Sequence, residues 1–325
     1  MTKLKYPLFD GEKVWEGAAV TVENGLITSV SACDPAECGE GFLLPGLIDA
    51  HTHIWTDVQV DALLRSGVTT ACDVAASKEL VESSKHLEIV SSAGMAMGMV
   101  LNPKGFVERA AANGARYIKV LLFNGFSIGK PALRSIVKVA HEKGLKVAVH
   151  ATEIATVRQA VDAGADILLH VPMKEAFPEE LAKTIAQKGI AVAPTLVMME
   201  AFCCSGQFGY KESDFPNALA AVKLLHESGV TILAATDANS ATYVPAVGFG
   251  DTLHYEMELL TNAGLTPIEV LAAVTSKNAD TFGIKAGRIA PGQPATMLLV
   301  EGRPDRNIFD SSKIRNIWVK GVEVL

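Results

Sequence analysis

Six side chains that could bind a metal ion stand within or directly after apolar segments of the chain. His51 and His53 form a His-x-His pair. In an extended strand residues two apart point to the same face, so the two imidazoles converge. Such a pair suits a borderline cation such as Zn²⁺, although Mn²⁺, Fe²⁺ or Ni²⁺ accept the same ligands. The other candidate ligands are Lys119, His150, His170 and Asp237.

Each of these residues has a plainer explanation when it is taken alone. His150 and His170 could be hydrogen-bonded core histidines, and Asp237 could cap a following helix. Unpaired polar side chains inside a core are costly, however, and a shared metal ion would satisfy all of them together. The joint placement of the set therefore favours a metal site.

Lys119 is the unusual member of this set, because an ammonium would be repelled by metal ions beside it. Its amine is expected to be neutral there, and a neutral amine can add CO2 to become an anionic carbamate that bridges two metals. An unmodified Lys119 paired with a carboxylate is the alternative.

The elements that position these residues follow a repeated pattern of a helical segment, a glycine and an apolar run. Left-handed glycines commonly end helices, and continuous apolar runs are typical of strands buried in a parallel sheet. The eight expected strands are 42–48, 68–75, 95–101, 116–123, 145–150, 167–171, 190–198 and 230–236. Their number favours an α/β fold of the (β/α)8 TIM-barrel type over an open doubly wound sheet.

In such a barrel the active site lies at the carboxyl ends of the strands, where the candidate ligands stand. Asp73 and Asn102 are further polar residues at expected strand ends. The chain ends differ from the barrel pattern, since both alternate short apolar runs with turn signals. We expect residues 1–41 and 284–325 to form a small β-sandwich and residues 42–283 to form the barrel.

The composition excludes several functional classes. Lys and Arg number 29 and Asp and Glu number 36, which gives a net charge of −7. This charge argues against a nucleic-acid or membrane partner, and no apolar run approaches the roughly 18 residues of a membrane span. The five scattered cysteines predict no disulfide framework and a cytoplasmic location. A homo-oligomer is left open.

Several motifs together resemble the amidohydrolase superfamily, in particular its imidazolonepropionase-like and prolidase-like branch. Residues 42–53 (FLLPGLIDAHTH) are similar to the family's first-strand signature, and residues 234–238 (AATDA) resemble its eighth-strand motif. Further resemblances lie at 117–120 (YIKV), 147–151 (VAVHA), 264–267 (GLTP), 272–275 (AAVT) and 287–292 (GRIAPG).

The resemblance implies metal-dependent hydrolysis of a C–N bond in a small-molecule substrate, whether an amide, a peptide or a cyclic amide. It implies that His51, His53 and Asp237 hold one ion, that His150 and His170 hold a second, and that carboxylated Lys119 bridges the two. Two ions, expected to be zinc from the ligand types, would activate a hydroxide that attacks the carbonyl. Asp237 would act as general base and then as general acid.

Two other functions compete with this interpretation. His150-Ala151-Thr152-Glu153 also matches a mononuclear deaminase of the same superfamily, in which Glu153 would shuttle a proton; Glu153 could equally be an ordinary first-turn acid of a helix. A barrel scaffold without catalysis is disfavoured because the ligand set is complete.

Tyr210 and Tyr243, on the loops after the last two expected strands, are candidate substrate contacts, although packed loop aromatics are the simpler explanation. The identity of the substrate is left open.

Overall fold

A computed structural model describes residues 1–123 and 128–325. Its central strands form two parallel sheets, one of three strands in the order β5-β6-β7 and one of five in the order β12-β11-β10-β9-β8. The strands are β5 (Leu47–Thr52), β6 (Val68–Asp73), β7 (Glu88–Ser91), β8 (Met95–Ala96), β9 (Tyr117–Leu121), β10 (Lys146–His150), β11 (Ile167–Leu169) and β12 (Ala191–Ala193).

Segment 231–238 lies between the two parallel sheets and is hydrogen-bonded to both. On one side, Leu233 N–H donates to Val192 O on β12 at 2.8 Å. On the other, Ala50 N–H on β5 donates to Ala234 O at 3.1 Å. This segment occupies the place of the expected last strand and brings β5 near β12.

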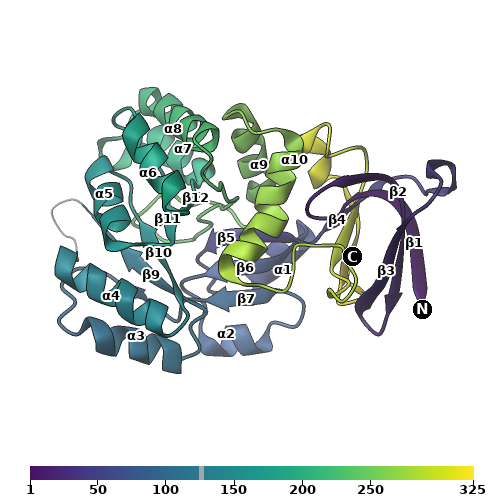
Figure 1. The fold of residues 1–325 in the computed structure, drawn as a ribbon, viewed down its shortest axis with the longest axis horizontal. Coiled ribbons are helices and arrows are strands. Elements are labelled where there is room, and N and C mark those ends of the chain that lie inside the picture. Colours follow the sequence, from purple (N-terminus) through teal and green to yellow (C-terminus); the bar gives the residue numbers. More distant parts are fainter. Residues whose placement is uncertain (124–127) are drawn as a thin grey trace.

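Helices flank the parallel strands, and Figure 1 shows α3 to α6 along an outer edge of the molecule with β9 to β12 on their inner side. The helices are α1 (Asp57–Arg65), α2 (Lys78–Ser83), α3 (Pro103–Ala112), α4 (Lys130–Glu142), α5 (Ile154–Ala163), α6 (Glu179–Gln187), α7 (Leu196–Ser205), α8 (Phe215–Glu227), α9 (Thr252–Asn262), α10 (Pro267–Ala272) and α11 (Asn278–Phe282). A π-helical turn, Ala273–Lys277, joins α10 to α11.

Alternation along β9 and β10 decides which side chains face the helices. Ile118 and Val120 belong to the large core that includes helix residues such as Leu133. Tyr117 and Ala148 belong to a separate core on the other side of the strands. Lys119 is two residues from Tyr117 and pairs in register with Ala148, so the period of two directs it away from the helices.

Four expected strands differ from the observed ones. The range 42–48 is divided between β5 and a strand at Phe42–Pro45 that belongs to the sheet of the chain ends. The range 230–236 contains an isolated bridge at Ile232 in place of a continuous strand.

On the side away from β5, β6 pairs with β7 (Glu88–Ser91). The expected strand 95–101 contains only the short strand β8. Asn102 therefore ends no strand; it caps α3 by accepting a hydrogen bond from Gly105 N–H at 2.9 Å. The expected strand 190–198 ends at Ala193, because α7 begins at Leu196.

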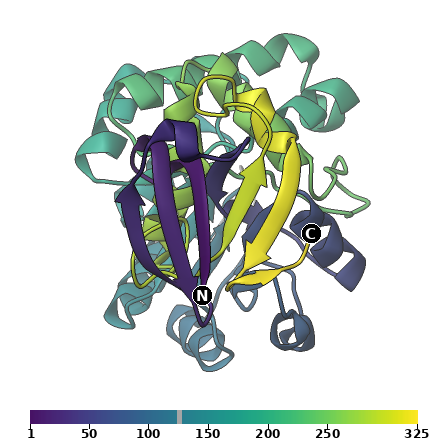
Figure 2. The same cartoon turned by 90° about the vertical axis from the view of Figure 1, so that its right-hand side faces the viewer.

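The two ends of the chain share a third sheet. Its seven strands have the order β15-β14-β13-β4-β1-β2-β3, and Figure 2 shows the purple N-terminal strands beside the yellow C-terminal ones. These strands are β1 (Thr2–Phe9), β2 (Val14–Glu23), β3 (Leu26–Ala32), β4 (Phe42–Pro45), β13 (Met297–Val300), β14 (Ile314–Val319) and β15 (Val322–Glu323). A separate hydrophobic cluster that includes Leu8, Val20 and Met297 belongs to this sheet.

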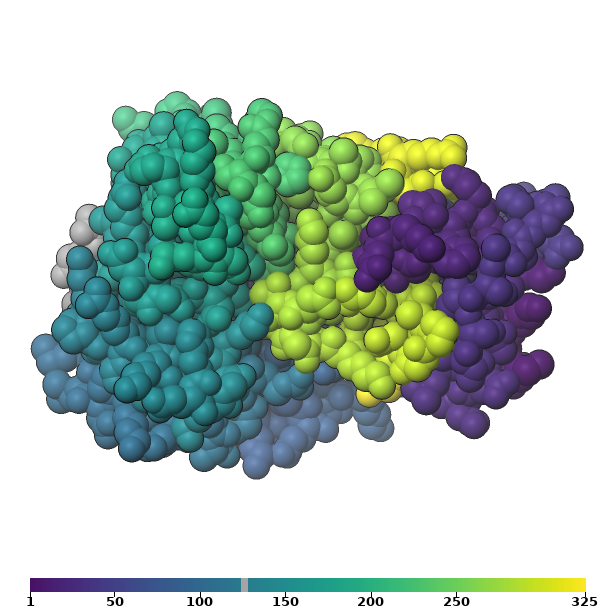
Figure 3. Space-filling model, in the orientation of Figure 1, coloured from purple at the N-terminus to yellow at the C-terminus, as the bar shows by residue number. Residues whose placement is uncertain are grey.

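The terminal sheet is attached to the helical part of the chain. Ser276 Oγ donates to Gly11 O, and Arg288 Nε lies 3.5 Å from Glu12 Oε1. In Figure 3 the purple N-terminal segment accordingly touches the yellow-green surface. Among the described residues, no helix has the length and apolar character needed to cross a membrane.

Candidate metal centre

The six predicted ligands come from five separate strands or strand ends and meet at one place. His51 lies on β5 with His53 just after it, Lys119 lies on β9, and His150 ends β10. His170 directly follows β11, and Asp237 lies in segment 231–238. Backbone bonds align the first and last of these, since Asp237 N–H donates to His51 O at 2.9 Å.

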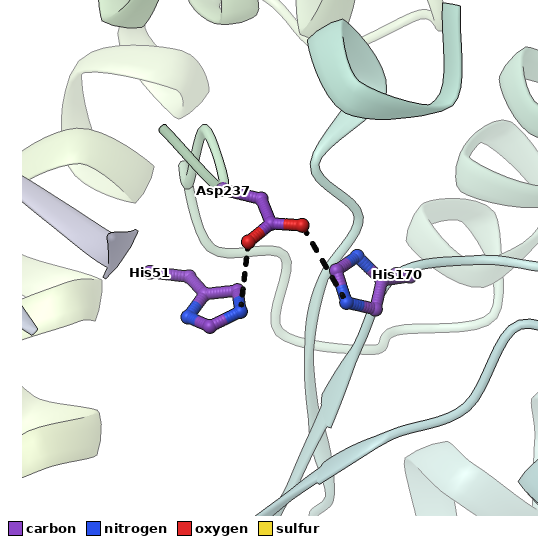
Figure 4. A group of neighbouring side chains, drawn as sticks. All are labelled: His51, His170 and Asp237. Carbon is purple, nitrogen blue, oxygen red and sulfur yellow. Dashed lines mark ion pairs between the residues drawn. The ribbon is translucent and has the colours of Figure 1, made fainter. Parts of the chain in front are cut away.

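The Asp237 carboxylate lies among three imidazoles. Its Oδ1 is 3.0 Å from His53 Nε2 and 3.3 Å from His51 Nε2. Its Oδ2 is 4.0 Å from His170 Nε2. Figure 4 shows the carboxylate between the rings of His51 and His170, with one oxygen directed at each. Ligand atoms of these three residues all lie within 4.8 Å of one another, a spacing that a single ion could fill.

Lys119 and His150 complete the cluster. Lys119 Nζ is 3.1 Å from His51 Nε2, and the Lys119 side chain is almost fully buried. The ring of His150 lies against that of His170, with centroids 4.4 Å apart. In the described part of the chain, His150 Nε2 is buried without a hydrogen-bond partner. All six expected ligands are therefore brought together.

Burial favours the neutral forms of the His51, His150 and His170 imidazoles. It lowers the pKa of His150 to about 3 and holds the pKa values of His51 and His170 well below the usual range, with nearby cationic groups adding to the effect. Burial also lowers the pKa of Lys119 to about 7, against the attraction of Asp237. A neutral imidazole has a lone pair free for a metal, so these shifts suit metal binding.

A second layer of side chains supports the cluster. His170 Nδ1 is 2.6 Å from the hydroxyl of Thr195. Asp49 binds both His51 N–H and Thr236 N–H through its Oδ1 atom. Asp73, expected as a polar strand-end residue, accepts hydrogen bonds from the backbone N–H groups of Ile54, Ala75 and Ala76 and holds the loops in place.

The backbone is strained at three positions of this site. His170, Asp237 and Thr195 have φ values of 73°, 59° and 50°. These values lie in the left-handed region of the backbone, which residues other than glycine rarely adopt. Each such residue costs about 1–3 kcal/mol, which the surrounding packing must offset. Strain of this kind concentrates at functional sites, in agreement with the clustering of the ligands.

The donor set fits divalent ions. It combines four imidazoles with a carboxylate, the ligand types that Zn²⁺ and similar ions prefer. The buried, unpartnered Nε2 atom of His150 is the clearest sign, because within the described residues nothing else uses its lone pair.

The two candidate substrate contacts are placed differently. Tyr210 packs against Phe202 with ring centroids 5.8 Å apart, and Lys174 Nζ lies 4.6 Å from the centre of its ring. Burial raises the pKa of Tyr210, and the charge of Glu153 contributes in the same direction, which places Tyr210 beside the start of α5. Tyr243 is 75% exposed.

Sequence reasoning missed two neighbours of the cluster. Phe123 lies against His150 with ring centroids 4.8 Å apart; its spacing of four from Lys119 could have indicated the same strand face. Thr195 carried no signal, because its contact with His170 joins residues 25 apart in the chain.

These features define a candidate metal centre in an α/β fold. A model of the amidohydrolase family matches residues 42–324, and the chain belongs to this family. Membership confirms the predicted enzyme class, a hydrolase of carbon–nitrogen bonds. No curated protein matches the sequence.

Solved structures with the same fold cover almost the whole chain. A Xaa-Pro dipeptidase with bound methionine has a TM-score of 0.83 at 18% identity, over 99% of this chain and 98% of that one. Ochratoxinase from A. niger has a TM-score of 0.83 at 18% identity, over 99% and 95% of the two chains. Phenylurea hydrolase B has a TM-score of 0.81 at 17% identity, over 99% and 97%. At these identities the likeness shows a common fold.

Proposed function

We propose that the chain is a binuclear amidohydrolase that cleaves an amide, peptide or cyclic amide bond. The observation that carries this proposal is the convergence of His51, His53, His150, His170, Lys119 and Asp237 from separate strands. In this proposal the parallel strands and segment 231–238 close into a (β/α)8 barrel whose first strand is β5, because β4 (Phe42–Pro45), although within the expected barrel range of 42–283, belongs to the terminal sheet. Residues 1–41 and 284–325 form the accompanying β-sandwich.

Two sets of residues would hold the ions. His51, His53 and Asp237 would bind one ion, and His150 with His170 would bind the other, both of them zinc. Bound there, the ions would supply an activated water and polarise the scissile carbonyl. Because His51 and His170 are 99% and 98% buried, bulk water has little access to their side of the site.

Lys119 would bridge the two sets as a carbamate. Its Nζ adds to the carbon of CO2, a new N–C bond forms, and one proton leaves to solvent. In the described structure Lys119 Nζ hydrogen-bonds to His51 Nε2, and the nearby Asp237 carboxylate attracts it without forming an ion pair with it. The carbamate would give this buried side chain the anionic charge that a cation-binding site needs.

Asp237 would transfer the proton of the reaction. Its carboxylate is 13% exposed and the His53 side chain is 22% exposed, whereas the His51 and His170 side chains are almost completely buried. Asp237 is thus the carboxylate of the ligand set and has access to a bound substrate. Its Oδ1 or Oδ2 atom takes the proton of the attacking water and passes it to the leaving nitrogen. Tyr210, beside the start of α5, would line the substrate-binding region, with Tyr243 on the more exposed loop.

The test is hydrolysis of a panel of dipeptides, N-acyl amino acids and cyclic amides by metal-loaded protein, with and without a chelator. We expect turnover on at least one C–N substrate and its loss on chelation. Absence of turnover across the panel, in protein shown to contain metal, would leave the scaffold as the better explanation.

A mononuclear deaminase is the second candidate, and one observation favours it. Glu153 precedes α5, and its Oε2 atom is buried without a hydrogen-bond partner among the described residues, so it is available to move a proton. Release of ammonia from an amino-substituted ring by protein with one ion per chain would support the deaminase.

The cytoplasmic location of the protein stays a prediction from its cysteine content.

A further inference from the structure

Helix α7 begins without the usual contribution from its own cap residue. Thr195 stands at the N-terminal cap position, where a threonine hydroxyl normally accepts a hydrogen bond from a first-turn N–H. Here the Thr195 side chain makes no such bond. Its hydroxyl donates instead to Pro194 O at 2.8 Å and lies 2.6 Å from His170 Nδ1.

The Thr195 hydroxyl has only one proton to donate, so these two contacts show which atom is the donor in each hydrogen bond. Because that proton goes to Pro194 O, the oxygen accepts from Nδ1–H of His170. The imidazole then has its lone pair on Nε2, the atom that faces Asp237 Oδ2 at 4.0 Å. Thr195 thus fixes both the orientation and the tautomer of His170 that metal binding requires.

Glu256, on α9, takes over the capping of α7. Leu196 N–H donates to Glu256 Oε1 at 3.0 Å, and Val197 N–H donates to Glu256 Oε2 at 2.8 Å. The Glu256 side chain is completely buried, which is costly for an acid unless hydrogen bonds compensate. A carboxylate at a helix N-terminus gains from both the free N–H groups and the helix dipole.

We propose that Glu256 is a positioning residue for the metal centre: by capping α7 from outside, it leaves the Thr195 hydroxyl free to hold His170. This inference rests on the proposed metal-binding function. The left-handed conformation of Thr195, with φ 50° and ψ 51°, belongs to the same arrangement, because ordinary N-terminal caps are extended. Without Glu256, the first-turn N–H groups of α7 lose their acceptor, and the hydroxyl of Thr195, at the cap position, would compete for that role.

The first experiment compares Glu256→Gln with Glu258→Gln at pH 9. Burial raises the pKa of Glu256 to about 8, so at pH 9 the wild-type carboxylate offers two acceptors where glutamine offers one. Glu258 is partly exposed on the same helix and serves as the matched control. We expect Glu256→Gln to lose the ion at the His170 position about 10- to 100-fold more readily during dialysis, and Glu258→Gln to retain it.

The second readout is ¹⁵N NMR of metal-free protein labelled at histidine. We expect one Nδ1–H tautomer for His170 in the wild type and in Glu258→Gln, and a mixture of tautomers in Glu256→Gln. A folded Glu256→Gln variant that keeps the wild-type tautomer and metal retention would overturn the proposal.

Thr195→Val tests the same link from the other end. Valine keeps the branched shape and removes the hydroxyl, so it should release the ion as readily as Glu256→Gln does. The double variant should release it no more readily than either single variant, because both changes break one connection. Additive losses would mean that Glu256 stabilises the fold without acting through Thr195.

Amide hydrogen exchange in Thr195→Val remains decisive even if Glu256→Gln does not fold. We expect Leu196 and Val197 N–H to exchange as slowly as in the wild type, because Glu256 and not Thr195 accepts them. Faster exchange would show that Thr195 is the cap and would refute the proposal. If wild-type protein instead bound no metal under any condition, the proposed function itself would fail, a result separable from these.

Discussion

Asp49 and Thr236 join the two strand ends that carry the His-x-His pair and Asp237. Thr236 Oγ1 donates to Asp49 Oδ2 at 2.6 Å, and Thr236 N–H donates to Asp49 Oδ1 at 3.0 Å. Asp49 Oδ1 also accepts from His51 N–H at 3.2 Å. One buried carboxylate therefore sets the spacing between residues that are 187 positions apart in the chain.

Replacing Thr236 with valine should destabilise the protein. The change keeps the side-chain shape but removes a donor from the buried Asp49 carboxylate, and such a loss costs about 1–3 kcal/mol. The free energy of unfolding in denaturant, measured on metal-free protein, checks this. Thr28→Val, at an exposed position in the terminal sheet, is the control. Equal stability of the two variants would contradict the prediction.

Asp237→Asn should reduce kcat by roughly 10²- to 10⁴-fold, the usual contribution of a general acid–base group. An amide cannot take the proton from the attacking water. Steady-state kinetics on any substrate found in the panel give the measurement, with Asp162→Asn on the exposed face of α5 as control. A variant that keeps wild-type kcat would remove Asp237 from its proposed role.

Elemental analysis should find two divalent ions per wild-type chain. His150→Asn should hold fewer, because it removes the imidazole whose Nε2 atom is buried and unpartnered within the described residues. His86→Asn, away from the cluster, should hold two. A wild-type content of one ion would favour the deaminase.

The carbamate on Lys119 should be visible by ¹³C NMR after metal-loaded protein is equilibrated with ¹³C-bicarbonate. We expect one slowly exchanging carbamate resonance, absent in Lys119→Ala and present in Lys138→Ala, which changes an exposed lysine of α4. Loss of the second ion should accompany Lys119→Ala. A wild-type spectrum without this resonance would favour an unmodified amine.

His254 should make the protein less stable as the pH falls below about 6.5. His254 Nε2–H donates to Ser66 O at 3.0 Å, and Nδ1 accepts from the Ser311 hydroxyl at 2.9 Å. Burial lowers the pKa of His254, so below its unfolded value the unfolded chain binds a proton that the folded chain excludes. One such group contributes up to about 1.4 kcal/mol per pH unit.

Denaturant unfolding between pH 5 and pH 8 measures this slope. The buried histidines of the metal centre act in the same direction, so the test is the difference between wild type and His254→Gln. That variant should show a shallower loss of stability at low pH, and His86→Gln should match the wild type. An unchanged slope in His254→Gln would contradict the assignment.

Spacing in the sequence was enough to predict which side chains share a strand face. Strand alternation is a local property, so the positions of Lys119 between Ile118 and Val120 and of His51 two residues before His53 could be predicted from spacing alone. The glycine-punctuated apolar runs likewise indicated parallel strands, and four of the eight, 68–75, 116–123, 145–150 and 167–171, lie close to the observed strands.

The contacts that hold the ligands in place depend on how distant segments pack. The strand beside β6, on the side away from β5, is β7 and not the expected segment 95–101, because pairing with β6 selects it. The contact of Asp49 with Thr236 joins residues 187 positions apart, and that of Glu256 with Leu196 on α7 joins residues 60 positions apart. No local pattern encodes such contacts, because a hydrogen bond between distant segments exists only after the strands and helices have packed.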